Sequence, residues 1–302
     1  MYDIIIVGAG PAGLTAALYA LRADKRVLII EKENFGGQIT FSPKVENYPT
    51  LMQISGNELA QMMLDQVLEH GADIEMAEVQ DIFCEEDRKA VLTDNGTFEA
   101  RAVILATGSK HRQLGLEMEN ELTGKGVSYC AVCDGAFFAG KDVAIVGGGN
   151  TALQEALMLS EYCTHVTMVQ NLATMTGEAR LVAALEKKDN VTMIFNTVVT
   201  ALIGEDALEE IVLYNETEDT VDSLKVDGLF VAIGQVPENE AFADLTRLNE
   251  AGYIIADERC LTDTEGIFVA GDCRTKAVRQ VTTATGDGAV AALAACRYID
   301  QL

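Results

Sequence analysis

One pattern occurs twice in this chain, and it restricts the possible folds more than any other feature. An apolar run leads into a glycine turn of the form G-x-G-x-x-G/A, and a helix-like pattern follows. The first turn is residues 8–13 and the second is residues 147–152. A buried strand, a glycine turn and a helix in this order are typical of a dinucleotide-binding unit. The sequence therefore predicts two Rossmann-like domains.

Further apolar runs indicate how the two domains are connected. Residues 103–108 and 229–234 form a second matching pair of strand patterns. A third run, residues 266–272, follows both and resembles the returning strand of the first domain. We predict an α/β fold in which the second Rossmann-like domain is inserted into the first. The predicted boundaries give residues 1–115 and 242–302 to the first domain and residues 116–241 to the second. Helix patterns at residues 58–69 and 288–299 are expected to pack the first domain.

Length and charge exclude several classes of protein. The 302 residues suffice for two domains, and 22 basic against 47 acidic residues give a net charge of −25. This acidity disfavours binding to nucleic acid or to an anionic membrane surface. Residues 4–21 carry no charge and approach the length of a membrane span, but glycines and a proline interrupt them. Seven cysteines, an odd number, fit a reducing compartment. We expect a cytoplasmic protein with no membrane association.

The first glycine turn has the neighbours that a nucleotide site requires. Glu31 ends the next predicted strand and lies 23 residues after Gly8. An acid about 20 residues after the turn binds a ribose hydroxyl in proteins of this class. The turn itself lets a pyrophosphate approach the helix N-terminus. The first domain is therefore predicted to bind a dinucleotide.

The second glycine turn lacks these neighbours. At the same spacing the residue is Gln170, and neither Arg nor Lys occurs in residues 171–176. Nothing near the turn is therefore suited to hold the ribose of NAD or the 2′-phosphate of NADP. An alternative is that a basic residue from elsewhere, such as Arg180 or Lys187, supplies the missing contact.

A C-x-x-C motif, Cys130 and Cys133, is followed directly by Asp134. No second motif or suitably spaced His completes a zinc site, so we expect no metal. A redox dithiol fits better, with Asp134 placed to move protons during thiol exchange. The remaining cysteines are expected to be buried small apolar residues, and they are Cys84, Cys163, Cys260, Cys273 and Cys296.

Together these motifs resemble the low-molecular-weight thioredoxin reductases. The likeness covers nearly the whole chain. The matching runs are residues 36–40, 45–49, 54–56, 130–135 and 271–272, with Arg279 and Gln280. The resemblance implies an enzyme that passes electrons through FAD and the Cys130/Cys133 dithiol to thioredoxin, and it also implies a homodimer.

The resemblance assigns roles to individual residues. Cys133 is expected to face the flavin, Cys130 to attack the protein disulfide, and Asp134 to act as acid and base. Glu31 is expected to hold the adenosine ribose and Asp272 the ribityl chain. The other implied FAD-binding residues are Gly8, Gly10, Pro11 and Ala12 at the pyrophosphate; Gly37, Gln38 and Asn47 toward the flavin; Arg279, Gln280 and Val281 at the isoalloxazine; and Lys32, Gly36, Val79, Ala106, Thr107, Gly108 and Gly271.

One departure from the family pattern concerns the electron donor. Members that use NADPH carry His-Arg-Arg and a further Arg where this chain has Gln170, Asn171, Leu172 and Thr176. The pattern is instead similar to the ferredoxin-dependent flavin thioredoxin reductases, which implies reduced ferredoxin as donor and partner. Ferredoxins are usually acidic, so docking would need a local basic surface. The candidates are Lys110, His111 and Arg112, and separately Arg274, Lys276 and Arg279.

Three other functions stay open at this point. The first is an NADPH-dependent thioredoxin reductase whose phosphate contacts have moved. The second is a small-molecule dithiol oxidase, a related class that tends to carry His where this chain has Asp134. The third is a flavin-bearing redox sensor without turnover, although an acid beside the thiols is of no use to a sensor.

Overall fold

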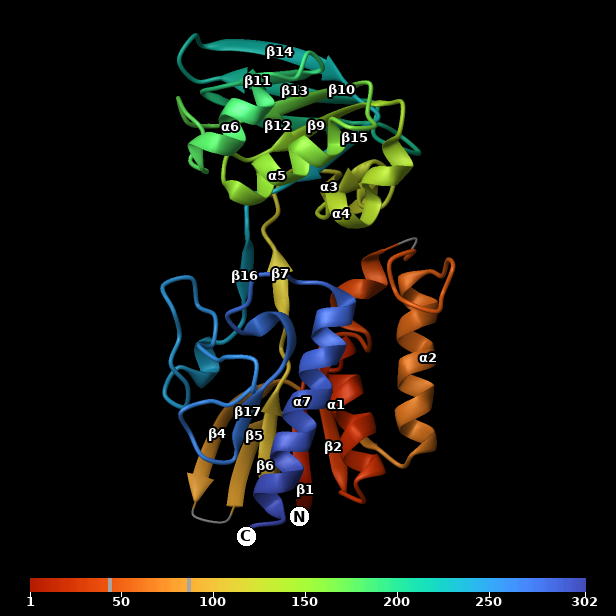
Figure 1. Cartoon of the computed structure of the whole chain (residues 1–302), viewed down its shortest axis with the longest axis vertical. Coiled ribbons are helices and arrows are strands. Elements are labelled where there is room, and N and C mark those ends of the chain that lie inside the picture. Colours follow the sequence, from red (N-terminus) through yellow and green to blue (C-terminus); the bar gives the residue numbers. More distant parts are fainter. Residues whose placement is uncertain (43–44, 86–87) are drawn as a thin grey trace. The chain divides into compact units, whose positions relative to one another are not determined.

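The computed structural model describes residues 1–42, 45–85 and 88–302. By their internal contacts these residues form two compact units. Unit 1 is Met1–Lys110 with Val236–Leu302, and unit 2 is His111–Gln235. The chain passes from one unit to the other within two paired strands, β7 (Ser109–His111) and β16 (Gln235–Pro237), labelled in Figure 1. The predicted boundaries lie a few residues later in the chain at both crossings.

Unit 1 is built on a seven-stranded sheet with the order β3-β2-β1-β6-β5-β4, in which β17 also pairs with β6. β1, β2, β3, β6 and β17 pair in parallel, whereas β4 and β5 are antiparallel. The strands are β1 (Tyr2–Val7), β2 (Val27–Glu31), β3 (Asp73–Met76), β4 (Val79–Glu85), β5 (Arg88–Thr93), β6 (Gly96–Leu105) and β17 (Ile267–Val269).

The central strand of unit 1 is buried on both faces. Along β1, Ile4 and Ile6 pack into one apolar core with the helices, while Ile5 and Val7 pack into a second core on the other face. This is why the strand reads as an unbroken apolar run rather than an alternating one. The helices of unit 1, shown in Figure 1, are α1 (Pro11–Arg22), α2 (Gly56–Glu69) and α7 (Val281–Ile299), with the short helices η1 (Gly37–Phe41), η3 (Glu240–Phe242) and η4 (Gly271–Cys273).

Helix α7 begins at Val281, earlier than the pattern at residues 288–299 predicts. Gln280 and Thr283 cap its N-terminus. The backbone amide of Gln280 donates to the Thr283 hydroxyl at 3.1 Å, and the Gln280 side chain accepts the backbone amide of Thr283. Gly288 inside the helix looks like a break in the sequence but serves its packing: a Cβ there would stand 2.2 Å from the carbonyl oxygen of Ala12 on α1. Glycine therefore lets α1 and α7 approach closely.

Unit 2 repeats the parallel plan on a smaller scale. Its sheet has the order β11-β10-β9-β15-β8, and every pair in it is parallel. One face packs on α5, and the other packs on a separate antiparallel sheet of β12, β13 and β14. The strands are β8 (Val127–Ser128), β9 (Asp142–Val146), β10 (His165–Val169), β11 (Val191–Ile194), β12 (Thr197–Ile203), β13 (Glu210–Asn215), β14 (Thr220–Lys225) and β15 (Gly228–Val231).

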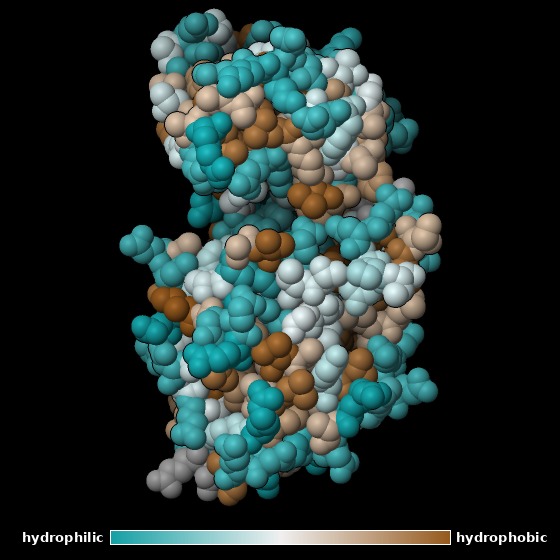
Figure 2. Space-filling model, in the orientation of Figure 1, coloured by the Kyte–Doolittle hydropathy of each residue, from teal (hydrophilic) through white to brown (hydrophobic). Residues whose placement is uncertain are grey.

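The helices of unit 2 are α3 (Glu119–Leu122), α4 (Ala131–Asp134), α5 (Asn150–Leu159) and α6 (Ala179–Leu185), with the short helix η2 (Gly135–Phe138). Both predicted strand–turn–helix units are thus present, as β1-α1 and β9-α5. Hydrophilic residues cover most of the visible surface of each unit in Figure 2. Among the described residues, no helix is long and apolar enough to span a membrane. The apolar stretch at residues 4–21 is β1, the glycine turn and most of α1.

Candidate active site and cofactor cradle

The first glycine turn brings backbone amides to the open N-terminus of α1. Gly8 has a φ of +104°, and a Cβ there would stand 2.4 Å from the carbonyl oxygen of Ala106. Only glycine fits this left-handed position and this close approach. At Gly10, the N-cap of α1, the nearest atom to an added Cβ is the Gly36 oxygen, 4.0 Å away. The helix end therefore has room for an anion, which its partial positive charge favours.

Glu31 ends β2 beside this turn. One carboxylate oxygen accepts the amide of Ala9, and the other accepts the amide of Glu33, each at 2.8 Å. The loop after it folds back on the turn, because the Gly36 amide donates to the Ala9 carbonyl at 2.8 Å. Lys32 instead forms an ion pair with Glu238 at 2.9 Å. The predicted ribose acid thus stands at the turn with lone pairs left for a ligand.

The carboxyl end of β6 borders the same turn. Ala106 and Thr107 lie against Gly8, and the Thr107 hydroxyl donates to the side-chain oxygen of Asn239 at 3.0 Å. Asn239 is buried and also donates to the carbonyl oxygens of Gly252 and Cys273, each at 2.9 Å. Sequence reasoning missed Asn239, because it follows no motif. It ties the end of β6 to the loop after β17.

Asp272 lies in the short helix η4, directly after β17. Its Oδ1 atom is buried and has no hydrogen-bond partner. Burial raises the pKa of the Asp272 carboxyl to about 6, against the opposing effect of nearby Lys276 and Arg279. A buried acceptor without a donor is unfavourable in the protein alone. It is suited to accept a hydroxyl from a bound ligand.

The N-terminus of α7 collects the remaining predicted residues. Asn47 donates to the side-chain oxygen of Gln280 at 3.1 Å, which joins the loop after η1 to the helix cap. Arg279 donates to the backbone oxygen of Asp272 at 3.3 Å and stacks over the Tyr253 ring. All predicted cofactor residues lie in unit 1. Val79 begins β4, in a segment that reaches Glu31 and Lys32: the Ala77 amide donates to the Glu31 carbonyl at 2.9 Å, and Glu78 pairs with Lys32 at 3.6 Å.

The second glycine turn packs closely on its own chain at Gly148. Gln170 is 4% exposed, and its side-chain nitrogen would stand 2.2 Å from a Cβ at Gly148. The amides of Thr176 and Gly177 donate to the Gly148 carbonyl at 2.8 and 2.9 Å. Asn150, the first residue of α5, accepts from the Glu178 amide at 2.7 Å. The loop after β10 therefore packs on the Gly148 backbone, as the loop after β2 packs on Ala9 in unit 1. The α5 N-terminus itself stays accessible: the nearest atom to an added Cβ at Gly149 is the Thr176 hydroxyl oxygen, 4.0 Å away, and Asn150 is exposed.

The charge beside the second turn is unfavourable to a phosphate. The side-chain nitrogen of Asn150 also donates to the carboxylate of Glu178 at 3.3 Å. Arg180 pairs with that carboxylate at 2.5 Å and is otherwise exposed. Lys187 is exposed beyond α6. Of the two basic residues named as alternatives, Arg180 is linked to the turn, through Glu178.

The two motif cysteines form a disulfide, with 5.3 Å between their Cα atoms. Cys130 is the N-cap of α4, and its sulfur accepts the Cys133 amide at 3.2 Å. Val132, between the cysteines, is 55% exposed. The motif is thus a disulfide on one turn of helix, with an exposed apolar residue beside it.

Asp134 stands directly behind this disulfide. One carboxylate oxygen accepts the Ser128 hydroxyl at 2.6 Å, while the other is buried without a partner. Burial raises the pKa of Asp134, and the Ser128 hydrogen bond opposes that rise. Ser128 also accepts the Cys130 amide at 3.1 Å. Sequence reasoning missed Ser128, whose position two residues before Cys130 was the available signal.

Glu155 is a second carboxyl near the cysteines that sequence reasoning missed. It lies on α5 and accepts the backbone amide of Ala131, the first residue of α4. Burial raises the pKa of Glu155 to about 7. In the sequence it looks like an ordinary polar position on an amphipathic helix, so no pattern reveals it.

Two expectations about side chains are wrong in part. Arg274 is 1% exposed and Lys276 is largely buried, and both pair with Asp287, so neither belongs to a basic docking surface. Cys84 is exposed, because it lies near the end of β4, where Phe83, Cys84 and Glu85 are all exposed. The other four single cysteines are buried as expected.

Comparison with known proteins identifies the chain. The family model of pyridine nucleotide-disulphide oxidoreductases matches residues 2–288, so the chain belongs to that family. A thioredoxin reductase of Listeria innocua is 42% identical over 100% of this chain and 95% of its own length. A Clostridium pasteurianum protein named as a 34.2 kDa protein in the rubredoxin operon is 41% identical over 98% and 97%. The Streptococcus pyogenes thioredoxin reductase structure matches with a TM-score of 0.96 at 39% identity, covering 100% and 99%.

These matches place the chain among the thioredoxin reductases, which are FAD-dependent disulfide reductases. The predicted family, fold class and cofactor are confirmed. Unit 1 has features that fit FAD: an open helix N-terminus at Gly10, an acid beside it at Glu31, and the unpartnered Oδ1 of Asp272. Unit 2 has Gln170 instead of an acid beside its turn.

Proposed function

We propose that this protein is a thioredoxin reductase that receives electrons from reduced ferredoxin rather than from NADPH. The observation that carries the proposal is the second glycine turn. Gln170 stands where the ribose-binding acid would be and packs on Gly148, and the positions where NADPH-using members carry arginine hold Asn171, Leu172 and Thr176. Each lost charge-assisted hydrogen bond to a phosphate removes roughly 1.5–3 kcal/mol. Losing several reduces NADPH affinity by orders of magnitude.

Within this proposal unit 1 is the FAD-binding domain and unit 2 carries the dithiol. The α1 N-terminus at Gly10 and Pro11 binds the pyrophosphate, Glu31 the ribose, and Asp272 a hydroxyl of the ribityl chain. FAD, when bound, takes up electrons singly or in pairs and delivers a pair to a disulfide, which suits a donor that carries one electron at a time. The relative named for a rubredoxin operon supports an iron–sulfur protein as donor.

The chain's own residues carry the thiol chemistry. Reduction of the Cys130–Cys133 disulfide takes two electrons and two protons and leaves two thiols. The Cys130 thiolate attacks the disulfide of thioredoxin, and the displaced sulfur takes a proton from Asp134. Cys133 then attacks Cys130, which releases the second thioredoxin sulfur and restores the Cys130–Cys133 disulfide. Ser128 holds the Asp134 carboxyl toward the cysteines through its 2.6 Å hydrogen bond.

Ferredoxin docking requires a positive area on an acidic protein. Of the candidates left after Arg274 and Lys276 are excluded, Lys110 already pairs with Glu33 and Glu238, at 2.6 and 3.2 Å. His111 stacks on Tyr129, and burial lowers its pKa. Arg112 is exposed. Lys110 and Arg112 are therefore the residues to reverse, and changing both to Glu is expected to slow reduction by ferredoxin in a salt-dependent way.

An NADPH-dependent enzyme with a relocated phosphate contact is the second candidate function. It is favoured by one observation: Arg180 pairs with Glu178, which is hydrogen-bonded to Asn150 at the start of α5. If the Glu178 side chain moved away, the Arg180 guanidinium would be free to bind a phosphate beside the turn. In this alternative Arg180→Ser abolishes reduction by NADPH, whereas in our proposal it leaves reduction by ferredoxin unchanged.

The electron donor is tested by mixing the anaerobic holoenzyme with excess NADPH, then NADH, then reduced ferredoxin, while recording flavin absorbance. The proposal expects bleaching only with ferredoxin. Rapid bleaching by NADPH that Arg180→Ser removes would establish the alternative. Oxygen consumption with a small dithiol and without thioredoxin would point to a dithiol oxidase instead.

We further propose a cytoplasmic homodimer. Five unpaired cysteines among the described residues suit a reducing compartment. A groove of about 360 Å³ in unit 1 lies among α1, α2 and α7, with Leu14, Leu18 and Met63 in its lining. Exposed Tyr19 and Met62 flank it. Light scattering of the holoenzyme is expected to give twice the 32.5 kDa chain mass, and Met62→Asp to give the monomer.

A further inference from the structure

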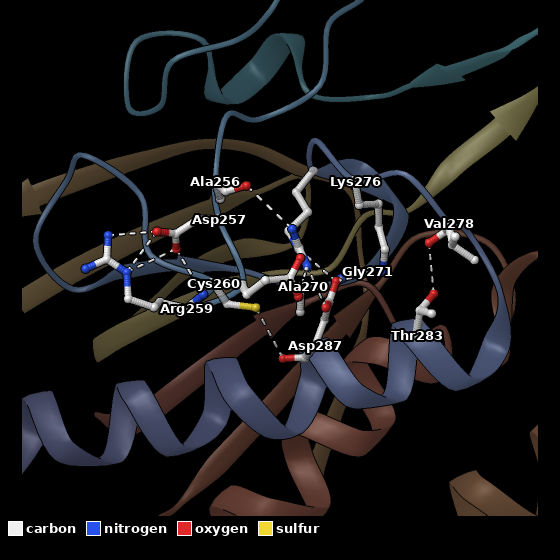
Figure 3. A network of polar contacts seen from close by, with 12 residues as sticks. Ala256, Asp257, Arg259, Cys260, Ala270, Gly271, Lys276, Val278, Thr283 and Asp287 are labelled. Atoms are coloured by element: carbon white, nitrogen blue, oxygen red, sulfur yellow. Dashed lines mark hydrogen bonds and ion pairs between the residues drawn. The ribbon is translucent and has the colours of Figure 1, made fainter.

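A buried cluster of charges stands next to the Asp272 turn and has no part in the thiol chemistry. Its centre is Asp287 on α7, which is 7% exposed and points toward the loop that carries Gly271 and Lys276 (Figure 3). The carboxylate accepts four hydrogen bonds. The donors are Gly271 N at 3.0 Å, Arg274 Nε and Nη2 at 2.8 Å each, and Lys276 Nζ at 2.9 Å.

The cluster holds the backbone of the turn in one conformation. Gly271 has a φ of +82°, a region that glycine adopts readily, and an added Cβ would stand 2.8 Å from the Ala12 side chain. Asp287 fixes the Gly271 amide from the other side. Arg279 spans the loop by donating to the backbone oxygens of Asp272 and Arg274, at 3.3 and 3.2 Å. The turn is thus tied to both α1 and α7.

The charges of the cluster do not cancel. Arg274 and Lys276 are two cations on one buried carboxylate, which leaves one positive charge in excess inside the protein. Glu258 approaches Arg274 at 3.6 Å, but its side chain is 92% exposed and therefore well screened by water. A buried charge is costly unless an opposite charge stands near it. Asp272 is the buried carboxyl that can balance the excess.

We propose that Asp287, Lys276 and Arg274 form a positioning network for FAD binding, which fixes the Asp272 turn and keeps the Asp272 carboxyl ionised. The network would be incomplete without a ligand, because the ionised Oδ1 of Asp272 has no donor in the protein. An ionised carboxylate accepts a hydroxyl more strongly than a neutral acid does. The inference rests on the assignment of Asp272 to FAD in the proposed function.

The titration of Asp272 is consistent with this role. Burial raises its pKa to about 6, while Lys276, Arg279 and Arg274 from the same loop lower it and Asp287 from α7 raises it. The charges of Lys276, Arg279 and Arg274 thus oppose the effect of burial and favour the ionised carboxyl. Removing the Lys276 charge leaves burial less opposed and moves the pKa of Asp272 upward.

Lys276→Met is the first variant to make, because it leaves the Arg274–Asp287 pair intact, whereas Asp287→Asn would strand two buried cations. The purified holoenzyme is diluted at pH 5.5 to 8.5, and released FAD is measured by its fluorescence. For the wild type, FAD binding weakens below about pH 6. For Lys276→Met we expect this inflection to rise by about one pH unit, so that binding weakens about twofold at pH 7 and about 8-fold at pH 5.5, the pH at which the variants are compared. Lys276→Arg restores both.

Two controls separate positioning from a general loss of structure. Lys89→Met removes another buried lysine of unit 1, on β5, and is expected to leave FAD binding unchanged. Asp272→Asn abolishes the pH inflection, and in that background Lys276→Met changes the dissociation constant less than twofold. Equal weakening by Lys276→Met in both backgrounds, or weakening independent of pH, would overturn the network.

The same measurements separate this inference from the proposed function. If Asp272→Asn binds FAD as tightly as the wild type, the assignment of Asp272 is wrong and the network falls with it, while the donor and the dithiol chemistry are untouched. Because no electron donor enters the assay, failure of the ferredoxin proposal leaves its result unchanged.

Discussion

The turns at residues 8–13 and 147–152 share a sequence pattern, and both join a buried strand to a helix. Gly8 and Gly147 have the same left-handed backbone, and a Cβ at either would stand 2.4 Å from a carbonyl oxygen of the neighbouring strand end. The differences begin at the next residues. The first turn faces the carboxylate of Glu31, whereas the second faces the amide side chain of Gln170, which packs on Gly148.

This difference teaches that the glycine pattern specifies a backbone turn and not a ligand. What decides binding is the side chain at the end of the second strand and the loop after it. Each unit also has one buried carboxylate oxygen without a partner among the described residues: Asp272 in unit 1 and Asp134 in unit 2. In unit 1 this oxygen stands near the open turn, while in unit 2 it stands at the disulfide. In our proposal the second unit has the fold of a nucleotide domain but carries its chemistry at the disulfide.

The largest expected effect removes the chemistry of unit 2 and spares unit 1. Cys130→Ser is expected to lower thioredoxin reduction on the order of 10³-fold or more, because no thiolate attacks the substrate disulfide. FAD should remain bound one per chain, as measured by absorbance. Cys84→Ser, which changes the exposed cysteine on β4, serves as the control and should keep full activity. Loss of FAD from Cys130→Ser would show that the two units are not functionally separate.

Equivalent substitutions in the two turns compare them directly. Gly8→Ala and Gly147→Ala impose the same strain, and each is expected to lower stability by roughly 1–3 kcal/mol in chemical denaturation. Gly8→Ala alone should weaken FAD binding more than about 100-fold, since it distorts the turn that holds the pyrophosphate. Similar loss of FAD from Gly147→Ala would contradict the assignment of FAD to the first turn alone.

The proton chemistry beside the disulfide gives a smaller effect. Asp134→Asn is expected to slow thioredoxin reduction about 100-fold, as removal of a general acid does. Burial raises the pKa of Asp134, so the acid stays protonated to a higher pH than an exposed Asp does. The wild-type rate should therefore fall as pH rises through that pKa, and the variant should lack this fall. Ser128→Ala should cost about 3–10-fold, because the acid loses its orienting hydroxyl. An unchanged pH profile in Asp134→Asn would rule out the assignment.

The smallest effect is one of stability. Burial raises the pKa of Glu155 to about 7, so the folded protein holds a proton that the unfolded chain releases from about pH 4.5 upward. Stability from this group is therefore lost as pH rises from about 4.5 to 7. Glu155→Gln should raise the unfolding free energy by about 1–3 kcal/mol at pH 8 and leave it unchanged at pH 4. The exposed Glu186→Gln is the matched control, and equal gains at both pH values would contradict the burial of the charge.

Much of the fold could be predicted because it depends on local patterns. The two strand–turn–helix units and the C-x-x-C follow from residue spacing, which requires no knowledge of tertiary contacts. Helix α7 was predicted too short, since Gly286 and Gly288 look like breaks until the packing on Ala12 is known. Arg274 and Lys276 look like surface charges for a similar reason: their partner, Asp287, lies more than ten residues away.

The candidate site was predictable where a motif marks it and not elsewhere. Glu31 and Asp134 follow motifs at fixed spacing. Glu155 and Asn239 act through contacts made by folding, so their sequence neighbours carry no signal, whereas Ser128 could have been suspected from its place two residues before Cys130. The second turn was predictable in part. The sequence shows Gln170 in place of the acid, but only the structure shows that the loop after Gln170 packs on Gly148.

The central claim is that one of the two turns binds a nucleotide and the other does not. Calorimetric titration of the oxidised holoenzyme with NADP⁺ tests it most directly, because this ligand binds without transferring electrons. With FAD already in unit 1, the account predicts no binding heat up to about 1 mM NADP⁺, a limit of about −4 kcal/mol. A micromolar dissociation constant, lost in Arg180→Ser, would contradict it and show that unit 2 is a working NADPH domain.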